Sequence, residues 1–125
     1  MTNTLEVTNL NTYFKSDYSS SKAVQNVSFH IEQGEVLALV GESGSGKTVT
    51  SLSVMGLLPT NGFIEKGKIL LLTKNNEKIN TLELSEKKLN SIRGNDVSMI
   101  FQEPMTSLNP TMTVGEQILE IILNH

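Results

Sequence analysis

A glycine-rich stretch at residues 41–48 carries the clearest chemistry in the chain. Its residues are Gly41, Glu42, Ser43, Gly44, Ser45, Gly46, Lys47 and Thr48. This order fits the phosphate-binding loop pattern G-x-x-x-x-G-K-[ST], also called Walker A. The glycines let the backbone wrap tightly, so that several N–H groups point into one cavity. The stretch therefore predicts a site for the phosphates of a nucleotide.

Two side chains of this stretch have separate predicted roles. Lys47 brings a mobile positive charge to the β- and γ-phosphates. The hydroxyl of Thr48 is an oxygen ligand suited to Mg²⁺ that bridges phosphate oxygens. The remaining residues contribute mainly their N–H groups, and Val49, which follows directly, is included in the predicted nucleotide site. The alternative is a glycine-rich turn with an incidental lysine, which we rank well below nucleotide binding.

The segments on both sides of the loop have the order that such a site requires. Residues 35–40 form an almost unbroken apolar run, which predicts a strand buried on both faces of a parallel sheet. Residues 49–58 are predicted to form a helix that ends before Pro59. The loop then lies at the N-terminus of this helix, where the partial positive charge favours an anion.

The other segments complete an α/β pattern. Alternating apolar residues at 5–14 and 27–31 predict an antiparallel hairpin, and residues 68–72 predict a further strand after a turn region flanked by glycines 62 and 67. Ser85 is a predicted N-cap of a helix that ends at Gly94. Residues 97–101 predict a second buried strand. Thr113 and Glu116 form a capping-box pattern for a last helix with one apolar face.

Gln102 is the second informative residue. It lies at the carboxyl end of the predicted strand 97–101, where α/β sheets place ligand-binding groups. Its neutral amide oxygen is able to join a magnesium shell without adding negative charge. A glutamine that only bonds solvent at a strand end is at least as good an interpretation from spacing alone. A degenerate Walker B motif at residues 100–103 ranks lower, because it needs an aspartate in place of Gln102.

Composition excludes several function classes. The chain has 125 residues, 18% of them charged, and a net charge of −3, so there is no electrostatic reason to expect a nucleic acid partner. It has no cysteine, which excludes disulfides, thiolate metal sites and a thiol redox role. No apolar run approaches the roughly 18 residues of a membrane-spanning helix, and the N-terminus lacks the features of a signal peptide.

Three stretches together resemble a known family. Residues 41–48, 55–59 and 98–110 look like the ATP-binding subunit of ABC transporters, and more narrowly like the subfamily that imports oligopeptides, dipeptides or nickel. The stretch 99–110 is the specific part, and residues 114–117 continue it. The resemblance implies ATP and Mg²⁺ as cofactors and makes Gln102 the Q-loop glutamine, a magnesium ligand and sensor. It also makes Phe14 the aromatic residue that stacks on adenine, with Tyr13 as the fallback; alternatively, either ring only packs in the hairpin.

The resemblance also implies partners. These are a second ATP-binding subunit, membrane-spanning permease subunits contacted through residues 105–112, and, indirectly, an extracytoplasmic solute-binding protein. The implied location is the cytoplasmic face of the cell membrane, as a peripheral protein. The implied function is ATP-driven import of peptides or a related small solute such as nickel. Two alternatives are a nucleotide-binding module without catalytic activity and another P-loop enzyme, such as a small-molecule kinase.

Several family motifs have no counterpart after Phe101. We find no L-S-G-G signature, Walker B aspartate, catalytic glutamate or switch histidine; Asp96 precedes its strand, Glu103 follows the Q-loop position, and His125 is the last residue. We therefore expect residues 1–125 to be the N-terminal portion of an ATP-binding domain, with no catalytic residue of its own. We also expect an incomplete parallel core sheet, the start of a helical subdomain, and poor folding in isolation.

Overall fold

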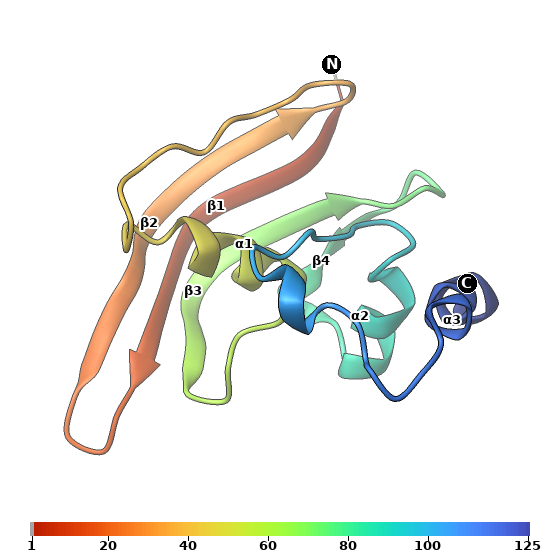
Figure 1. Ribbon diagram of the computed structural model, residues 1–125. Coiled ribbons are helices and arrows are strands. Elements are labelled where there is room, and N and C mark those ends of the chain that lie inside the picture. The colour runs from red at the N-terminus through yellow and green to blue at the C-terminus, as the bar shows by residue number, and fades with distance from the viewer. Residues whose placement is uncertain (1) are drawn as a thin grey trace.

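A four-stranded antiparallel sheet forms the centre of the molecule. The computed structural model describes residues 2–125, with the strands in the order β2-β1-β3-β4 (Figure 1). The strands are β1 (Asn3–Lys15), β2 (Ser20–Glu32), β3 (Gly62–Leu72) and β4 (Lys78–Asn80). The helices are α1 (Lys47–Met55), α2 (Glu86–Ile92) and α3 (Val114–Asn124), with the 3-10 turns η1 (Thr81–Glu83) and η2 (Pro104–Thr106). The predicted hairpin is confirmed as the pair β1–β2.

A bulge interrupts both ladders of β1. The register shifts between Val7 and Leu10 against β2, and Asn9 and Asn26 adopt left-handed φ angles of 47° and 52°. The side chain of Asn11 joins the two sides of the bulge, donating to the carbonyl of Asn9 and accepting from the N–H of Asn26. Gly67 faces the bulge from β3, where a Cβ would lie 2.9 Å from the Cα of Leu10. Gly67 is thus needed for a close strand approach, and not for the predicted turn.

Helix α1 packs on one face of the sheet (Figure 1). Val54 of α1 joins a buried cluster of sheet residues, namely Val7, Leu10, Val24 and Ile69. The buried hydroxyls of Thr12 and Ser53 are 2.9 Å apart and hydrogen-bond across this interface. A second cluster, of Leu71, Leu89 and Ile92, fixes α2 beneath the other end of β3. These contacts position the helix that starts at the glycine-rich loop.

The two predicted parallel strands are not formed, and this part of the prediction is wrong. Residues 35–40 and 98–101 have no regular secondary structure, and within residues 2–125 the only parallel pairing is an isolated bridge between Arg93 and Val97. Val36 is 93% exposed and Ile100 is 98% exposed. After α1 the chain joins the free edge of β1 as β3 instead of returning beside residues 35–40. Each segment is apolar enough for a buried strand, but neither has a ladder partner.

The predicted helix caps are confirmed. The Ser85 hydroxyl accepts from the N–H of Lys88, and Thr113 and Glu116 form both bonds of a capping box. The predicted end of helix 49–58 is wrong, because α1 ends at Met55, three residues earlier, where Gly56 caps it with a left-handed φ of 67°. Helix α3 has no buried residue and lies away from the sheet in Figure 1, so its apolar face is exposed. No helix in residues 2–125 is long and apolar enough to cross a lipid bilayer.

Away from the helices, one carboxyl group is electrostatically perturbed. Glu6 accepts hydrogen bonds from the side chains of Asn3 and Lys78. These bonds, first that of Asn3 and then that of Lys78, hold the pKa of Glu6 below its ordinary value. Glu6 lies in the inner strand β1, paired with both β2 and β3, and does not belong to the site described below.

Candidate nucleotide-binding site

The ammonium group of Lys47 is held inside the glycine-rich loop. It donates to the carbonyls of Gly41 and Glu42, the latter at 2.8 Å, and to the hydroxyl of Ser45 at 3.2 Å. The loop therefore curls around the cation with its carbonyls facing Lys47. A phosphate entering the loop brings stronger, charged acceptors within reach of the same ammonium group.

Gly46 allows the loop to lie against the sheet. Its φ angle is 99°, and a Cβ there would lie only 2.5 Å from the carbonyl oxygen of Ala23 in β2. Backbone cannot move aside as a flexible side chain can, so this position admits only glycine. Gly44 also has a left-handed φ angle, 80°, but no atom lies within 4 Å of its would-be Cβ. The two glycines thus serve different purposes, close packing at Gly46 and a turn at Gly44.

A cavity of about 460 Å³ opens above this loop. It is lined by Ala23, Ser43, Gly44, Ser45, Gly46, Lys47, Thr48, Val49 and Gln102. The structure thus brings Gln102 to the loop, although it lies 54 positions after Thr48 in the chain. A neighbouring cavity again has Lys47, Thr48 and Gln102 in its lining and adds Glu103. Gly41 and Glu42 take part through the carbonyls that hold Lys47.

The donors in the cavity suit a magnesium ion only in combination with phosphate. Thr48 supplies a hydroxyl and Gln102 an amide oxygen, and both residues are exposed. Residues 2–125 contain no group of three or more His, Cys, Asp or Glu side chains placed to hold a metal. Mg²⁺ ordinarily takes one or two protein oxygens together with phosphate oxygens and water. The donor set therefore fits Mg²⁺ that arrives with a nucleotide, which would neutralise charge on the phosphates.

Comparison with known protein families identifies the family of this chain. A family described as "ABC transporter" matches residues 24–124, which is most of the chain and includes every residue of the cavity lining except Ala23. The chain belongs to the ABC transporter family. This confirms the resemblance inferred from the motifs at residues 41–48 and 98–110.

Relatives and solved structures agree with this ABC transporter assignment. The chain is 52% identical over 125 residues to the oligopeptide transport ATP-binding protein AppD of Bacillus subtilis, covering all of this chain and 37% of AppD. It is 50% identical over 121 residues to the dipeptide transport ATP-binding protein DppD of Lactococcus lactis, covering 97% of this chain and 33% of DppD. The chain thus spans about a third of the length of these relatives.

A solved structure supports the fold of this ABC transporter chain. The dimeric structure of MJ0796, a bacterial ABC transporter cassette, superposes with a TM-score of 0.76 at 24% identity, covering 97% of this chain and 48% of that one. Identity at this level indicates a shared fold only. The predicted α/β class, as the N-terminal part of such a cassette, is confirmed.

The structure does not bring Phe14 to the phosphate cavity of this ABC transporter chain. Phe14 is half-buried and pairs with Gly62, where a Cβ would lie 3.0 Å from its ring. Tyr13 points to the other face of the sheet and stacks on Phe63, with ring centroids 5.7 Å apart. The ammonium of Lys15 lies 5.1 Å from the Phe63 centroid. Tyr13 therefore has a structural partner, and adenine stacking by Phe14 stays a prediction.

Replacing each ring separately tests the adenine assignment. Phe14→Ala should weaken ATP and ADP binding alike, by about 1–3 kcal/mol, because stacking depends on the base and not on the γ-phosphate. Tyr13→Ala should lower stability through its contact with Phe63 and leave both affinities unchanged. Calorimetric titration of both nucleotides measures this. Loss of affinity in Tyr13→Ala with none in Phe14→Ala would move the role to Tyr13.

Three residues that position the site were missed by sequence reasoning. Ala23 contributes the carbonyl against which Gly46 packs. Gln117 organises residues 105–112, since its amide bonds the N–H and carbonyl of Asn109 and the carbonyl of Met112. Arg93 binds the C-terminal end of α1. The sequence contains one signal for this role, namely that Arg93 is a basic residue near the end of a predicted helix. The carbonyls that Arg93 binds belong to residues 37 and 38 positions away, so the sequence does not indicate them.

Proposed function

We propose that this chain is the phosphate-binding, N-terminal portion of an ATP-binding domain that drives solute import. The observation that carries the proposal is one cavity that gathers Lys47, Thr48 and Gln102 in an ABC transporter chain. ATP would bind with its phosphates in the loop, and Thr48 and Gln102 would hold Mg²⁺, which would neutralise charge on the phosphates. The relatives named above transport oligopeptides and dipeptides, so peptides or a related small solute such as nickel are the proposed cargo.

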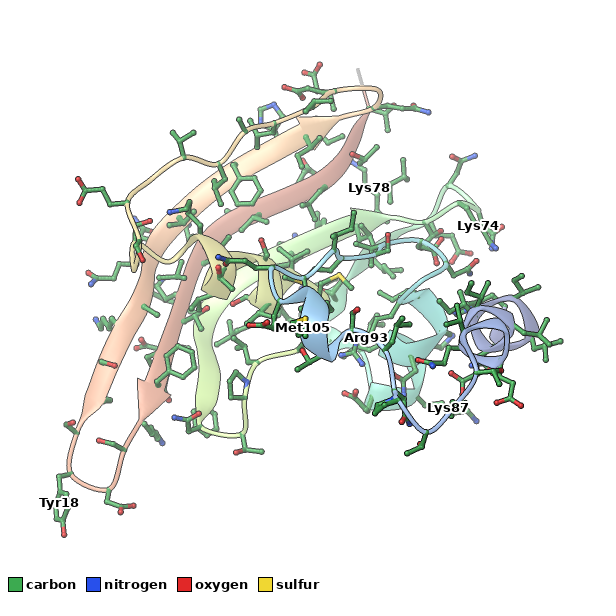
Figure 2. The ribbon with its side chains drawn as sticks, in the orientation of Figure 1. Tyr18, Lys74, Lys78, Lys87, Arg93 and Met105 are labelled. Atoms are coloured by element: carbon green, nitrogen blue, oxygen red, sulfur yellow. The ribbon has the colours of Figure 1, made fainter. Side chains whose placement is uncertain are left out.

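The proposed partners follow from the same family. A second ATP-binding subunit pairs with the domain, an arrangement supported by the dimeric MJ0796 cassette. Membrane-spanning permease subunits dock on residues 105–112, which carry Met105 at 86% exposure and Leu108 at 52% (Figure 2). The proposed location is the cytoplasmic face of the cell membrane, where the domain would serve an extracytoplasmic solute-binding protein indirectly.

Transport by the longer protein tests this function. The protein that contains these residues, assembled with its permease subunits in vesicles, should accumulate labelled peptide only when ATP is supplied on its own side of the membrane. The same assembly with Lys47→Ala should accumulate none. Equal uptake by both assemblies would contradict the proposal and favour a nucleotide-binding module that does not drive transport.

Residues 1–125 on their own should not turn over ATP at a useful rate. Phosphoryl transfer depends on a positioned water and on charges around the γ-phosphate. Within residues 2–125, Glu103 is the only carboxylate that lines either cavity at the loop, and it follows the Q-loop position. Phosphate release from purified 1–125 should therefore equal that of Lys47→Ala. Steady turnover that is lost in Lys47→Ala and in Glu103→Gln would instead identify Glu103 as a catalytic base.

A further inference from the structure

Arg93 fixes the end of α1 that is furthest from the phosphate loop. Its Nε donates to the carbonyl of Met55 at 2.9 Å, and a second guanidinium nitrogen donates to the carbonyl of Gly56 at 2.7 Å. These are among the carbonyls that a helix end leaves without intrahelical partners, and a cation there also opposes the helix dipole. The remaining guanidinium nitrogen binds Glu86 and Asn90 of α2. The side chain is only 14% exposed.

The same residue also starts the segment that leads to Gln102. Arg93 and Val97 form the isolated parallel bridge, and Gly94 donates to the carbonyl of Val97 at 2.7 Å. Asp96 in this turn accepts from the N–H of Lys74 at 2.8 Å, which ties the turn to the end of the sheet. The turn at residues 93–97 is therefore held at both ends, and residues 98–102 leave it from a fixed point.

Helix α1 and residues 98–102 form two arms that both extend from the neighbourhood of Arg93 to the phosphate cavity. Residues 99–102 share a cavity wall with Ser51 and Leu52 of α1, and both arms end at the phosphate cavity, one at Thr48 and the other at Gln102. The nine residues of α1 span about 13 Å. Arg93 closes the opposite end of this pair of arms. Through its hydrogen bonds to the carbonyls of Met55 and Gly56, Arg93 joins the end of α1 to the turn from which residues 98–102 start.

We propose that Arg93 is a positioning residue for the magnesium ligands. By holding the end of α1 against the turn at residues 93–97, it sets the separation between the Thr48 hydroxyl and the Gln102 amide. The inference rests on the proposed nucleotide site. Arg93 lines neither cavity at the loop, so its loss should affect the Mg²⁺-dependent part of ATP affinity and spare the part that Lys47 provides.

Titration of ATP with Mg²⁺ and with a chelator tests this, using wild type, Arg93→Ala, Gln102→Ala and the double variant. Arg93→Ala should weaken the apparent Mg²⁺ affinity about 10- to 100-fold, the scale for residues that support metal ligands, and leave ATP affinity in chelator unchanged. In the double variant the loss should equal that of Gln102→Ala alone, because both changes act on one ligand. Arg93→Lys, which keeps the charge but lacks the fork, should lie between wild type and Arg93→Ala.

Two controls separate positioning from stability. Ile69→Val removes a buried methylene from β3 and should lower stability without changing Mg²⁺ affinity, and Glu86→Gln should behave as wild type because both carbonyl bonds of Arg93 persist. Equal weakening of ATP with and without Mg²⁺ in Arg93→Ala and Arg93→Lys, or additive losses in the double variant, would overturn the inference. Wild type that fails to bind ATP at all would instead overturn the nucleotide site itself.

Discussion

Gly46→Ala is expected to abolish nucleotide binding at the loop. A Cβ at this position would lie 2.5 Å from the carbonyl oxygen of Ala23, and the φ angle of 99° is one that alanine rarely adopts. The added methyl group forces the loop away from β2, and the N–H groups lose the common direction that a phosphate requires. Calorimetric titration with ATP should show no saturable binding, while the circular dichroism spectrum should keep its strand signal.

Gly44→Ala is the matched control for this change. Gly44 has a comparable φ angle of 80° but open space around its would-be Cβ. The substitution costs about 1–2 kcal/mol of backbone strain without a clash, so ATP binding should weaken and still saturate. If Gly44→Ala and Gly46→Ala bound ATP equally well, the packing of the loop against Ala23 would have no part in the site.

Lys47→Ala is expected to have the second-largest effect. The ammonium group is already enclosed by the loop, where it bonds the carbonyls of Gly41 and Glu42 and the Ser45 hydroxyl. Hydrogen bonds to charged groups contribute about 1.5–3 kcal/mol, which corresponds to roughly 10- to 150-fold in the dissociation constant for ATP. The loss should be smaller for a nucleotide with fewer phosphates.

Lys87→Ala separates this local effect from a change in net charge. Lys87 is an exposed lysine of α2 (Figure 2), outside the lining of both cavities at the loop. Its removal changes the net charge by the same amount and should leave the dissociation constant for ATP unchanged. Equal affinities of Lys47→Ala and wild type would remove the phosphate-binding role of Lys47.

Features encoded by short stretches were predictable from the sequence. The hairpin follows from alternation in residues 5–14 and 27–31, and the caps at Ser85 and Thr113 follow from side chains that bond N–H groups within the same turn. The phosphate loop is also local, since its spacing alone brings Lys47 back to the carbonyls of Gly41 and Glu42. The family assignment depended on residues 98–110, which identify the family by resemblance to its members and not by the spacing of their residue types.

Features that need distant partners were not predictable in this way. The apolar runs 35–40 and 97–101 satisfy the composition of buried strands, but pairing depends on which strands lie beside them, and β3 joins β1 instead. The sequence around Gly67 predicts a turn and not a close strand approach, because the bulge that Gly67 faces lies in another strand. The role of Arg93 depends on Met55 and Gly56, which belong to another helix end.

We propose that the loop binds the phosphates of a nucleotide and that Gln102 helps to hold the accompanying Mg²⁺. Amide NMR spectra of ¹⁵N-labelled protein, recorded as ATP and Mg²⁺ are added, test it most directly. We expect saturable shifts of the backbone amides of residues 43–49 and of the Gln102 side-chain amide, with α3 unchanged and with clearly smaller shifts in Lys47→Ala at the same ATP concentrations. Spectra in which residues 43–49 do not move, or in which Lys47→Ala gives the same shifts as wild type, would contradict it.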